Sequence, residues 1–172
     1  MKKTNLFVLA VTFVWLVGGS TVLAQKYDDK EHAEFAKALK GVKTSLEKGL
    51  SASEGQGKPI SGKFEVEDGK LQLSVYTIKG DKFSEVIVDH KAGKVAKTEA
   101  ITGGGDLTAA KAQNGAMAKA KVSLRSATEK AVKANKGFRA VSVTPSLKDG
   151  HPVAEVTLVK GDEFKTASEK LD

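Results

Sequence analysis

The sequence predicts an α+β protein made of two tandem units, each a helix packed on a small antiparallel β-meander. Three observations predict this fold. Apolar residues recur at helical spacing after the N-terminal segment, and from Ile60 onward they alternate with polar residues as in a strand. The segment KGDKF at residues 79–83 then returns almost unchanged as KGDEF at residues 160–164, which indicates a duplication.

Two pairs of turn residues support the duplication because they repeat at one spacing. Asp-Gly occurs at residues 68–69 and 149–150, and Gly-Asp occurs at residues 80–81 and 161–162. The two offsets agree, since 149 − 68 and 161 − 80 both equal 81. Such dipeptides favour two-residue hairpin loops, so each unit is expected to contain two hairpins.

The N-terminal segment, residues 1–24, is predicted to be a signal peptide rather than part of the fold. Two lysines precede an apolar run over residues 6–17, and the residues before Gln25 favour cleavage after Ala24. An uncleaved membrane anchor is the alternative, because residues 6–24 nearly reach the length that spans a bilayer. The glycines that interrupt this stretch favour cleavage. The protein is therefore expected to be exported, to the periplasm or outside the cell.

Composition excludes some chemistry and leaves a mild basic bias. The chain has no cysteine, so it has no disulfide, no thiolate metal site and no lipid attached through cysteine. Without the two lysines of the signal the net charge is 26 − 21 = +5. An acidic protein, an anionic cell surface or a nucleic acid is compatible with this bias, but its commonest meaning is solubility.

The first unit, residues 25–101, is expected to start with a helix and continue as a meander. Apolar residues on one helical face are Phe35, Leu39, Val42, Leu46 and Leu50, and the polar stretch at residues 53–59 ends the helix. Strands then flank the turns at 68–69 and 80–81. The predicted core of this unit comprises Leu46, Leu50, Phe64, Val66, Leu71, Leu73 and Val75.

The second unit, residues 107–172, repeats the plan after a glycine-rich linker at residues 102–106. Its helix is expected from Leu107 to about Asn135, with Asp106 as N-cap and an early break at residues 114–115 as the alternative. The predicted core comprises Leu124, Val132, Val141, Val143, Val156 and Leu158. Its last segment, FKTASEKLD, departs from FSEVIVDHK of the first unit, so we expect a C-terminally truncated repeat with a short or frayed last strand.

The segment EVIVDHKAGKV, residues 85–95, carries a turn in which Asp89 can bond backbone donors and Gly93 can adopt positive φ before Lys94. This segment resembles the end of a PepSY domain, although Ala92 stands where that family usually has threonine. The resemblance spans residues 44–101 and, less well, 122–172. It implies an exported module that binds or inhibits a protein, with a peptidase as the partner by analogy.

Strand parity predicts a candidate interface. Tyr76 and Ile78 lie on the face opposite the core residues of their strand, and Phe83 and Ile87 share one phase of the next strand. One helix covers only one face of a sheet, so some of these four side chains are expected to meet the second unit or a partner protein.

No catalytic constellation, metal site or cofactor is expected, because His32, His90 and His151 are scattered and no nucleophile motif occurs. A non-catalytic protein is therefore predicted. The alternative function is binding of an anionic surface polymer or nucleic acid by the basic second helix. Its cations are Lys111, Lys119, Lys121, Arg125, Lys130, Lys133 and Lys136.

Overall fold

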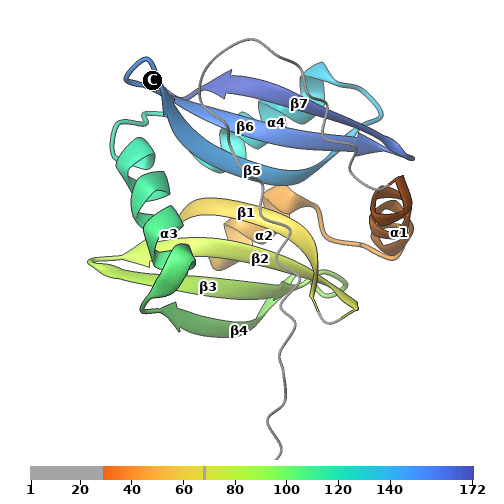
Figure 1. The fold of residues 1–172 in the computed structure, drawn as a ribbon, viewed down its shortest axis with the longest axis horizontal. Coiled ribbons are helices and arrows are strands. Elements are labelled where there is room, and N and C mark those ends of the chain that lie inside the picture. The colour runs from red at the N-terminus through yellow and green to blue at the C-terminus, as the bar shows by residue number, and fades with distance from the viewer. Residues whose placement is uncertain (1–28, 68) are drawn as a thin grey trace, which may run out of the picture.

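A computed structural model describes residues 29–67 and 69–172 and shows a single seven-stranded antiparallel sheet in the order β4-β3-β2-β1-β5-β6-β7 (Figure 1). The strands are β1 (Lys58–Glu67), β2 (Lys70–Lys79), β3 (Lys82–Asp89), β4 (Lys94–Ile101), β5 (Arg139–Lys148), β6 (His151–Lys160) and β7 (Glu163–Lys170). The helices are α1 (Asp29–Leu39), α2 (Leu46–Ser53), α3 (Gly104–Met117) and α4 (Leu124–Ala134). The predicted cleavage site at Ala24 and Gln25 lies outside the described residues.

The predicted fold of two separate meanders is wrong, because one sheet runs through both units. Strands β1 and β5 pair antiparallel through Gly62 with Val143 and Lys63 with Ser142. The physical reason is that each meander alone would leave the backbone of its first strand unpaired at an edge. Alternating apolar residues report which face of a strand is buried, but they do not report which edges join.

The duplication is visible in the sheet as an approximate two-fold relation. Gly62 pairs with Val143, its own counterpart, since 143 − 62 equals 81. Register shifts also recur at this offset, between Pro59 and Ser61 in β1 and between Ala140 and Ser142 in β5. The approximate axis therefore passes through the Gly62–Val143 pair, between β1 and β5.

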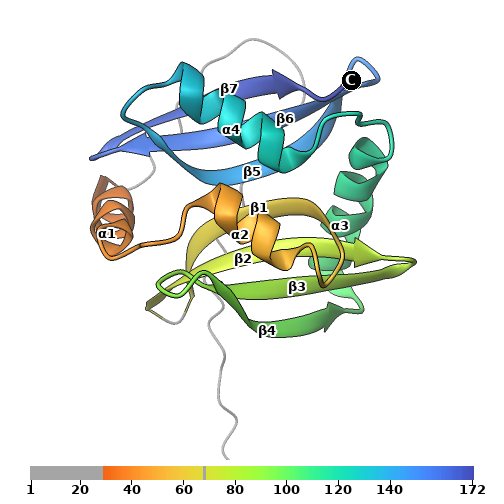
Figure 2. The same ribbon diagram turned by 180° about the vertical axis from the view of Figure 1, so that it is seen from behind.

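Helices α2 and α4 lie side by side on one face of the sheet (Figure 2). A serine N-cap begins each of them: the Ser45 hydroxyl accepts a hydrogen bond from the Lys48 N–H, and the Ser123 hydroxyl accepts one from the Ser126 N–H. We call the opposite face of the sheet the outer face. Figure 1 looks onto the outer face, with α3 crossing one end of it and α1 standing at the other end.

The expected helix over residues 35–50 is interrupted, with α1 ending at Leu39 and α2 beginning at Leu46. The interruption has a tertiary cause, because the N–H groups of Lys43 and Thr44 donate to the His90 carbonyl at 3.0 and 2.9 Å. A backbone N–H that donates to another element cannot also make the hydrogen bond that a continuous helix requires.

The expected helix over residues 107–135 is likewise two helices, α3 and α4, and Asp106 is not an N-cap because Gly103 holds that position. The residues expected to mark an early break, 114–115, lie inside α3. The chain leaves the helix after Met117, and the N–H groups of Lys121 and Val122 donate to the Leu171 carbonyl. The expected linker at 102–106 is therefore partly helical.

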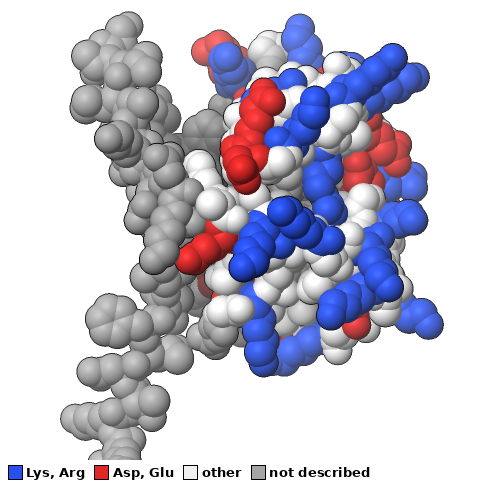
Figure 3. All heavy atoms as spheres, turned by 90° about the vertical axis from the view of Figure 1, so that its right-hand side faces the viewer, with Lys and Arg blue, Asp and Glu red and all other residues white. Residues whose placement is uncertain are grey.

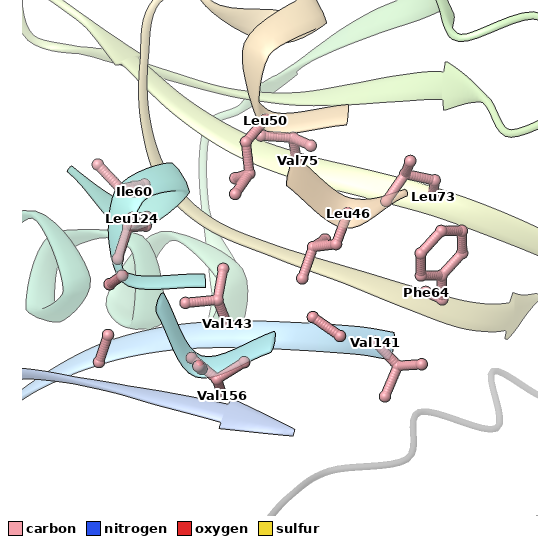
Figure 4. Packing of buried hydrophobic residues seen from close by; sticks show 14 of the residues in the cluster. Leu46, Leu50, Ile60, Phe64, Leu73, Val75, Leu124, Val141, Val143 and Val156 are labelled. Atoms are coloured by element: carbon pink, nitrogen blue, oxygen red, sulfur yellow. The ribbon is translucent and has the colours of Figure 1, made fainter. Parts of the chain in front are cut away.

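The core lies between the sheet and the pair formed by α2 and α4 (Figure 4). Gly62 permits close approach of α2, because a Cβ atom there would lie 3.2 Å from Leu50 Cδ2. Most predicted core residues are buried, but Val66 is 44% exposed, and Leu71 and Val132 are only partly buried. Val66 sits near the end of β1, beyond the middle of the core.

The expected short or frayed last strand is wrong. Strand β7 pairs with β6 at every position from Glu163 to Lys170, without a register shift. Leu171 follows it with no exposed surface. Within residues 29–67 and 69–172, no helix combines the length and apolar character needed to span a bilayer.

Candidate functional site

All four predicted interface residues lie on the outer face, as their register shows. Tyr76 pairs with Glu85 and Ile78 pairs with Phe83, while Ile87 lies opposite Ser74. Directly paired residues of an antiparallel sheet share a face, so strands β2 and β3 present these side chains together.

Helix α3 divides this set into a covered and an open part. The Ser61 hydroxyl of β1 donates to Gln113 Oε1 at 2.7 Å, and Lys58 Nζ donates to the Met117 carbonyl at 3.2 Å, which fixes α3 against the sheet. Phe83 is only 8% exposed, and Ile78, which pairs with it, is partly buried against the hydrophobic core cluster that includes Phe83 and Ala110 of α3. Helix α3 crosses this end of the outer face (Figure 1). The fold therefore uses Ile78 and Phe83 internally.

Tyr76 and Ile87 remain as the open part, because no described helix lies in front of the middle of β2 and β3 in Figure 1. Both side chains are partly buried, and Tyr76, like Ile78, also packs against the hydrophobic core cluster. Polar groups surround them, so we define the Tyr76 patch as Lys63, Gln72, Tyr76, Glu85 and Ile87. The sequence interpretation missed Lys63, Gln72 and Glu85. Glu85 could have been found from the sequence, because the two-residue turn at 80–81 sets the register that places Glu85 opposite Tyr76.

Hydrogen bonds and a cation order the Tyr76 patch. Gln72 Nε2 donates to Ser74 Oγ at 2.9 Å and to Glu85 Oε1 at 3.4 Å. Lys63 Nζ lies 5.7 Å from the centroid of the Tyr76 ring, within cation–π range, and it also forms an ion pair with Glu65.

Burial shifts the proton equilibria of Tyr76 and Glu85, the two acidic groups at the centre of the patch, towards their neutral forms. Burial raises the pKa of the Tyr76 hydroxyl well above its usual value, and the carboxylates of Glu85 and Glu65 raise it further. Burial also raises the pKa of the Glu85 carboxyl, partly offset by the hydrogen bond from Ser74. A tyrosine that holds its proton is a hydrogen-bond donor rather than a base or nucleophile, so the arrangement suits recognition.

The predicted turn motif has a structural role in the first repeat. Asp89 Oδ1 accepts hydrogen bonds from the Lys91 and Ala92 N–H groups at 2.8 and 3.0 Å. Gly93 has a φ of 70°, and a Cβ atom there would lie 3.1 Å from Thr44 Oγ1. The turn thus packs on the loop before α2, whose backbone it also binds through the His90 carbonyl. Lys94 is exposed and begins β4.

Replacement of Asp89 with alanine is expected to reduce thermal stability at neutral pH but not in strong acid. The hydrogen bonds from the Ala92 and Lys91 N–H groups lower the pKa of the Asp89 carboxyl. A lowered folded-state pKa gives stability that is present above the unfolded-state pKa and is lost as pH falls through the folded-state value. Melting curves of both proteins from neutral to acidic pH should therefore converge. A constant difference in Tm at every pH would contradict this role.

The sequence predicted no metal site at the histidines. Among the described residues, no three acidic or histidine side chains are grouped so that they could hold a metal ion. His32 stacks on Phe164, with ring centroids 4.6 Å apart. His90 lies in the turn after β3, and His151 Nδ1 lies 2.8 Å from Asp172 Oδ2. The three histidines therefore occupy three separate parts of the structure.

The cations of the predicted basic helix are distributed over α3, the loop after it, α4 and, for Lys136, the segment that follows α4. All seven of its cations are exposed, but Lys130 pairs with Glu169 at 2.7 Å and Lys119 Nζ donates to the Gly150 carbonyl. Figure 3 shows Lys and Arg side chains spread over one side of the molecule among acidic ones. The cations do not form one helical stripe, because the helix that would carry them is broken after Met117.

A groove of about 230 Å³ lies between the C-terminal end of α2 and the N-terminal end of α4. Leu50, Met117 and Leu124 give it an apolar lining, and Glu54, Lys58 and Arg125 supply charged groups. Lys58 Nζ donates to the Met117 carbonyl, so the fold itself holds one of the three charged groups of the groove in place.

Comparison of the chain with protein-family models, with curated proteins and with solved structures gives no match. The PepSY resemblance therefore remains a prediction that rests on the residues of the segment 85–95 and on their spacing.

Proposed function

We propose that the protein is an exported, non-catalytic binding module that regulates or inhibits a peptidase through protein–protein contact. The Tyr76 patch is the observation that supports the binding role. It presents an aromatic ring and the aliphatic side chain of Ile87 within a polar rim, on a sheet face where no described helix covers the middle of β2 and β3. Tyrosine is enriched at protein interfaces because it offers a rigid apolar surface and one hydrogen bond.

A flat, rigid sheet face suits a folded partner. Four side chains of the patch come from β2 and β3, which pair over seven register positions, and Lys63 comes from the adjoining strand β1. Hydrogen bonds from Gln72 also hold the patch. Little conformational entropy is then lost when a partner binds. Support for a peptidase as the partner comes from the PepSY resemblance, and the geometry of Asp89 and Gly93 agrees with the turn that this resemblance implies.

The test is capture of partners from the native exported fraction by the immobilised mature chain, combined with an assay of peptidase activity on casein. The wild-type protein is expected to retain a peptidase and to reduce the activity in proportion to its concentration. Ile87→Asp is expected to weaken both effects by about tenfold or more, because it places a charge in an apolar contact.

A matched control distinguishes loss of binding from loss of folding. Val66→Asp places the same charge on an exposed aliphatic residue of the other face and is expected to leave capture unchanged. Since Ile87 is partly buried, Ile87→Thr provides a milder change that keeps the β-branched shape. Equal capture by wild type and by folded Ile87 variants would exclude this surface, and an unchanged casein assay would exclude peptidase inhibition.

The alternative function, binding of an anionic polymer or nucleic acid, has a separate test. Exposed Arg125 and Lys133 on α4 favour it. Binding to heparin or DNA at low salt that falls steeply towards physiological salt would support this alternative. Absence of binding at low salt would reject it.

A further inference from the structure

The two repeats differ at their outer edges. In the first repeat, β3 pairs with β4, which completes four strands. The counterpart of β3 in the second repeat is β7, since Glu163–Lys170 lies 81 residues after Lys82–Asp89. Strand β7 is the last strand in the sheet order, so the position that β4 occupies in the first repeat is empty beside β7 among the described residues (Figure 1).

The edge of β7 is shaped for pairing, whereas the edge of β4 is not. Strand β4 carries a register shift opposite Ile87 and Val88 of β3, and such irregularities protect sheet edges. Strand β7 has no register shift over its eight positions. A regular, unbulged edge is a template for another strand.

The hydrogen-bonding groups at this edge follow from the ladder. The Leu171 N–H donates to the Pro152 carbonyl of β6. Backbone groups alternate in direction along an antiparallel strand, so Glu169 and Ala167 bond towards β6. Thr166 and Ser168 therefore direct their N–H and C=O groups away from the sheet.

We infer that β7 pairs antiparallel with β7 of a second copy of this chain, forming a two-fold dimer with one continuous sheet. Charge complementarity identifies the partner as a second copy. When Ala167 lies opposite Ala167 of the other copy, Lys165 of each copy lies opposite Glu169 of the other. Opposite charges at paired positions stabilise a sheet.

The same register satisfies the remaining positions. Thr166 lies opposite Ser168 of the second copy, so the outward backbone groups of these residues meet in hydrogen-bonded pairs. Lys165 and Glu169 share the face covered by α4, since they pair with Leu158 and Ala154 of β6. Each of these charged side chains also has a contact within its own chain: Glu169 pairs with Lys130 at 2.7 Å, and Lys165 Nζ lies 4.0 Å from the centroid of the Phe138 ring. The small Ala167 at the axis allows the two strands to approach.

A cysteine crosslink tests the register directly, because the chain contains no cysteine. In this dimer Ala167 forms a non-hydrogen-bonded pair with itself, whose Cα atoms are separated by about 4.5 Å, within the range of a disulfide. Ala167→Cys is expected to form a covalent dimer under mild oxidation. The matched control is Thr98→Cys on β4, at the other edge of the sheet. Thr98 pairs with Val86, and Val86 is the residue of the first repeat that corresponds to Ala167. Equal crosslinking of the two variants would overturn the proposal.

Two further variants separate dimerisation from folding, with mass measured by light scattering. The wild-type chain is expected to show twice the monomer mass, and Thr166→Pro is expected to restore the monomer mass with an unchanged circular dichroism spectrum. Its N–H points away from β6, so proline removes no bond within the chain. A wild-type monomer at high protein concentration, or a dimer that persists in folded Thr166→Pro, would overturn the proposal.

Charge reversal supplies the last test. Lys165→Glu creates two like-charged pairs and is expected to raise the dimer dissociation constant by about tenfold or more. Adding Glu169→Lys restores opposite charges and is expected to recover the dimer. Failure of this double variant to recover the dimer would exclude the proposed register.

Discussion

Replacing Val143 with aspartate is expected to remove most of the stability of the protein. Val143 has no exposed surface and pairs with Gly62 across the junction of the two repeats. A buried carboxylate without a partner destabilises a fold by at least about 4 kcal/mol, and domains of this size are stable by only about 5–15 kcal/mol. Guanidinium unfolding at neutral pH, followed by circular dichroism, measures the loss.

The neighbouring residue provides the control for this prediction. Ser142 pairs with Lys63 and lies on the outer face. Ser142→Asp places the same charge beside a lysine in partial contact with water, so its effect is expected to be below about 1 kcal/mol. Equal stability losses in the two variants would show that a negative charge at the junction is destabilising by itself, and that the burial of Val143 does not cause the loss.

The sequence predicted local features of this sheet well. Alternation around Phe64, Leu73 and Val75 identified strand faces correctly, because the period of two is a property of each strand alone. The offset of 81 residues placed both hairpin turns in each repeat. Pairing between β1 and β5 was not predicted, since it depends on two edges distant in sequence that carry no local signal.

Helix boundaries were missed for a related reason. Apolar spacing continues through residues 40–45 and 118–123, so periodicity alone predicts longer helices. The His90 and Leu171 carbonyls accept hydrogen bonds from backbone N–H groups of these two segments, and the helices end there. Tertiary hydrogen bonds override local propensity at both places.

Part of the candidate site was also accessible from the sequence. Strand parity placed Tyr76, Ile78, Phe83 and Ile87 on one face, which the register shows. The covering of Ile78 and Phe83 by α3 was not predicted, because residues 102–106 were interpreted as a linker and α3 as part of a longer helix. A helix whose apolar face is mostly alanine gives a weak amphipathic signal.

Leu171→Ala is expected to lower the free energy of unfolding by about 2–5 kcal/mol, as for other buried leucines. The side chain has no exposed surface, although it follows the last strand of the described sheet. Its backbone joins two elements, because its N–H donates to the Pro152 carbonyl at 3.0 Å and its carbonyl accepts from the Lys121 and Val122 N–H groups. Loss of the side chain loosens this junction before α4 as well as the core.

The control for this second prediction is Asp172→Ala, which removes an exposed carboxylate and its 2.8 Å contact with His151. Its effect is expected to be small, because solvent screens an exposed pair. Denaturant titration of both variants measures the difference, and hydrogen exchange at Lys121 and Val122 reports on the junction. Faster exchange at these amides in Leu171→Ala, with no change in Asp172→Ala, is expected because the buried side chain holds the Leu171 carbonyl in place. A loss below about 1 kcal/mol in Leu171→Ala would mean that the core closes without this side chain.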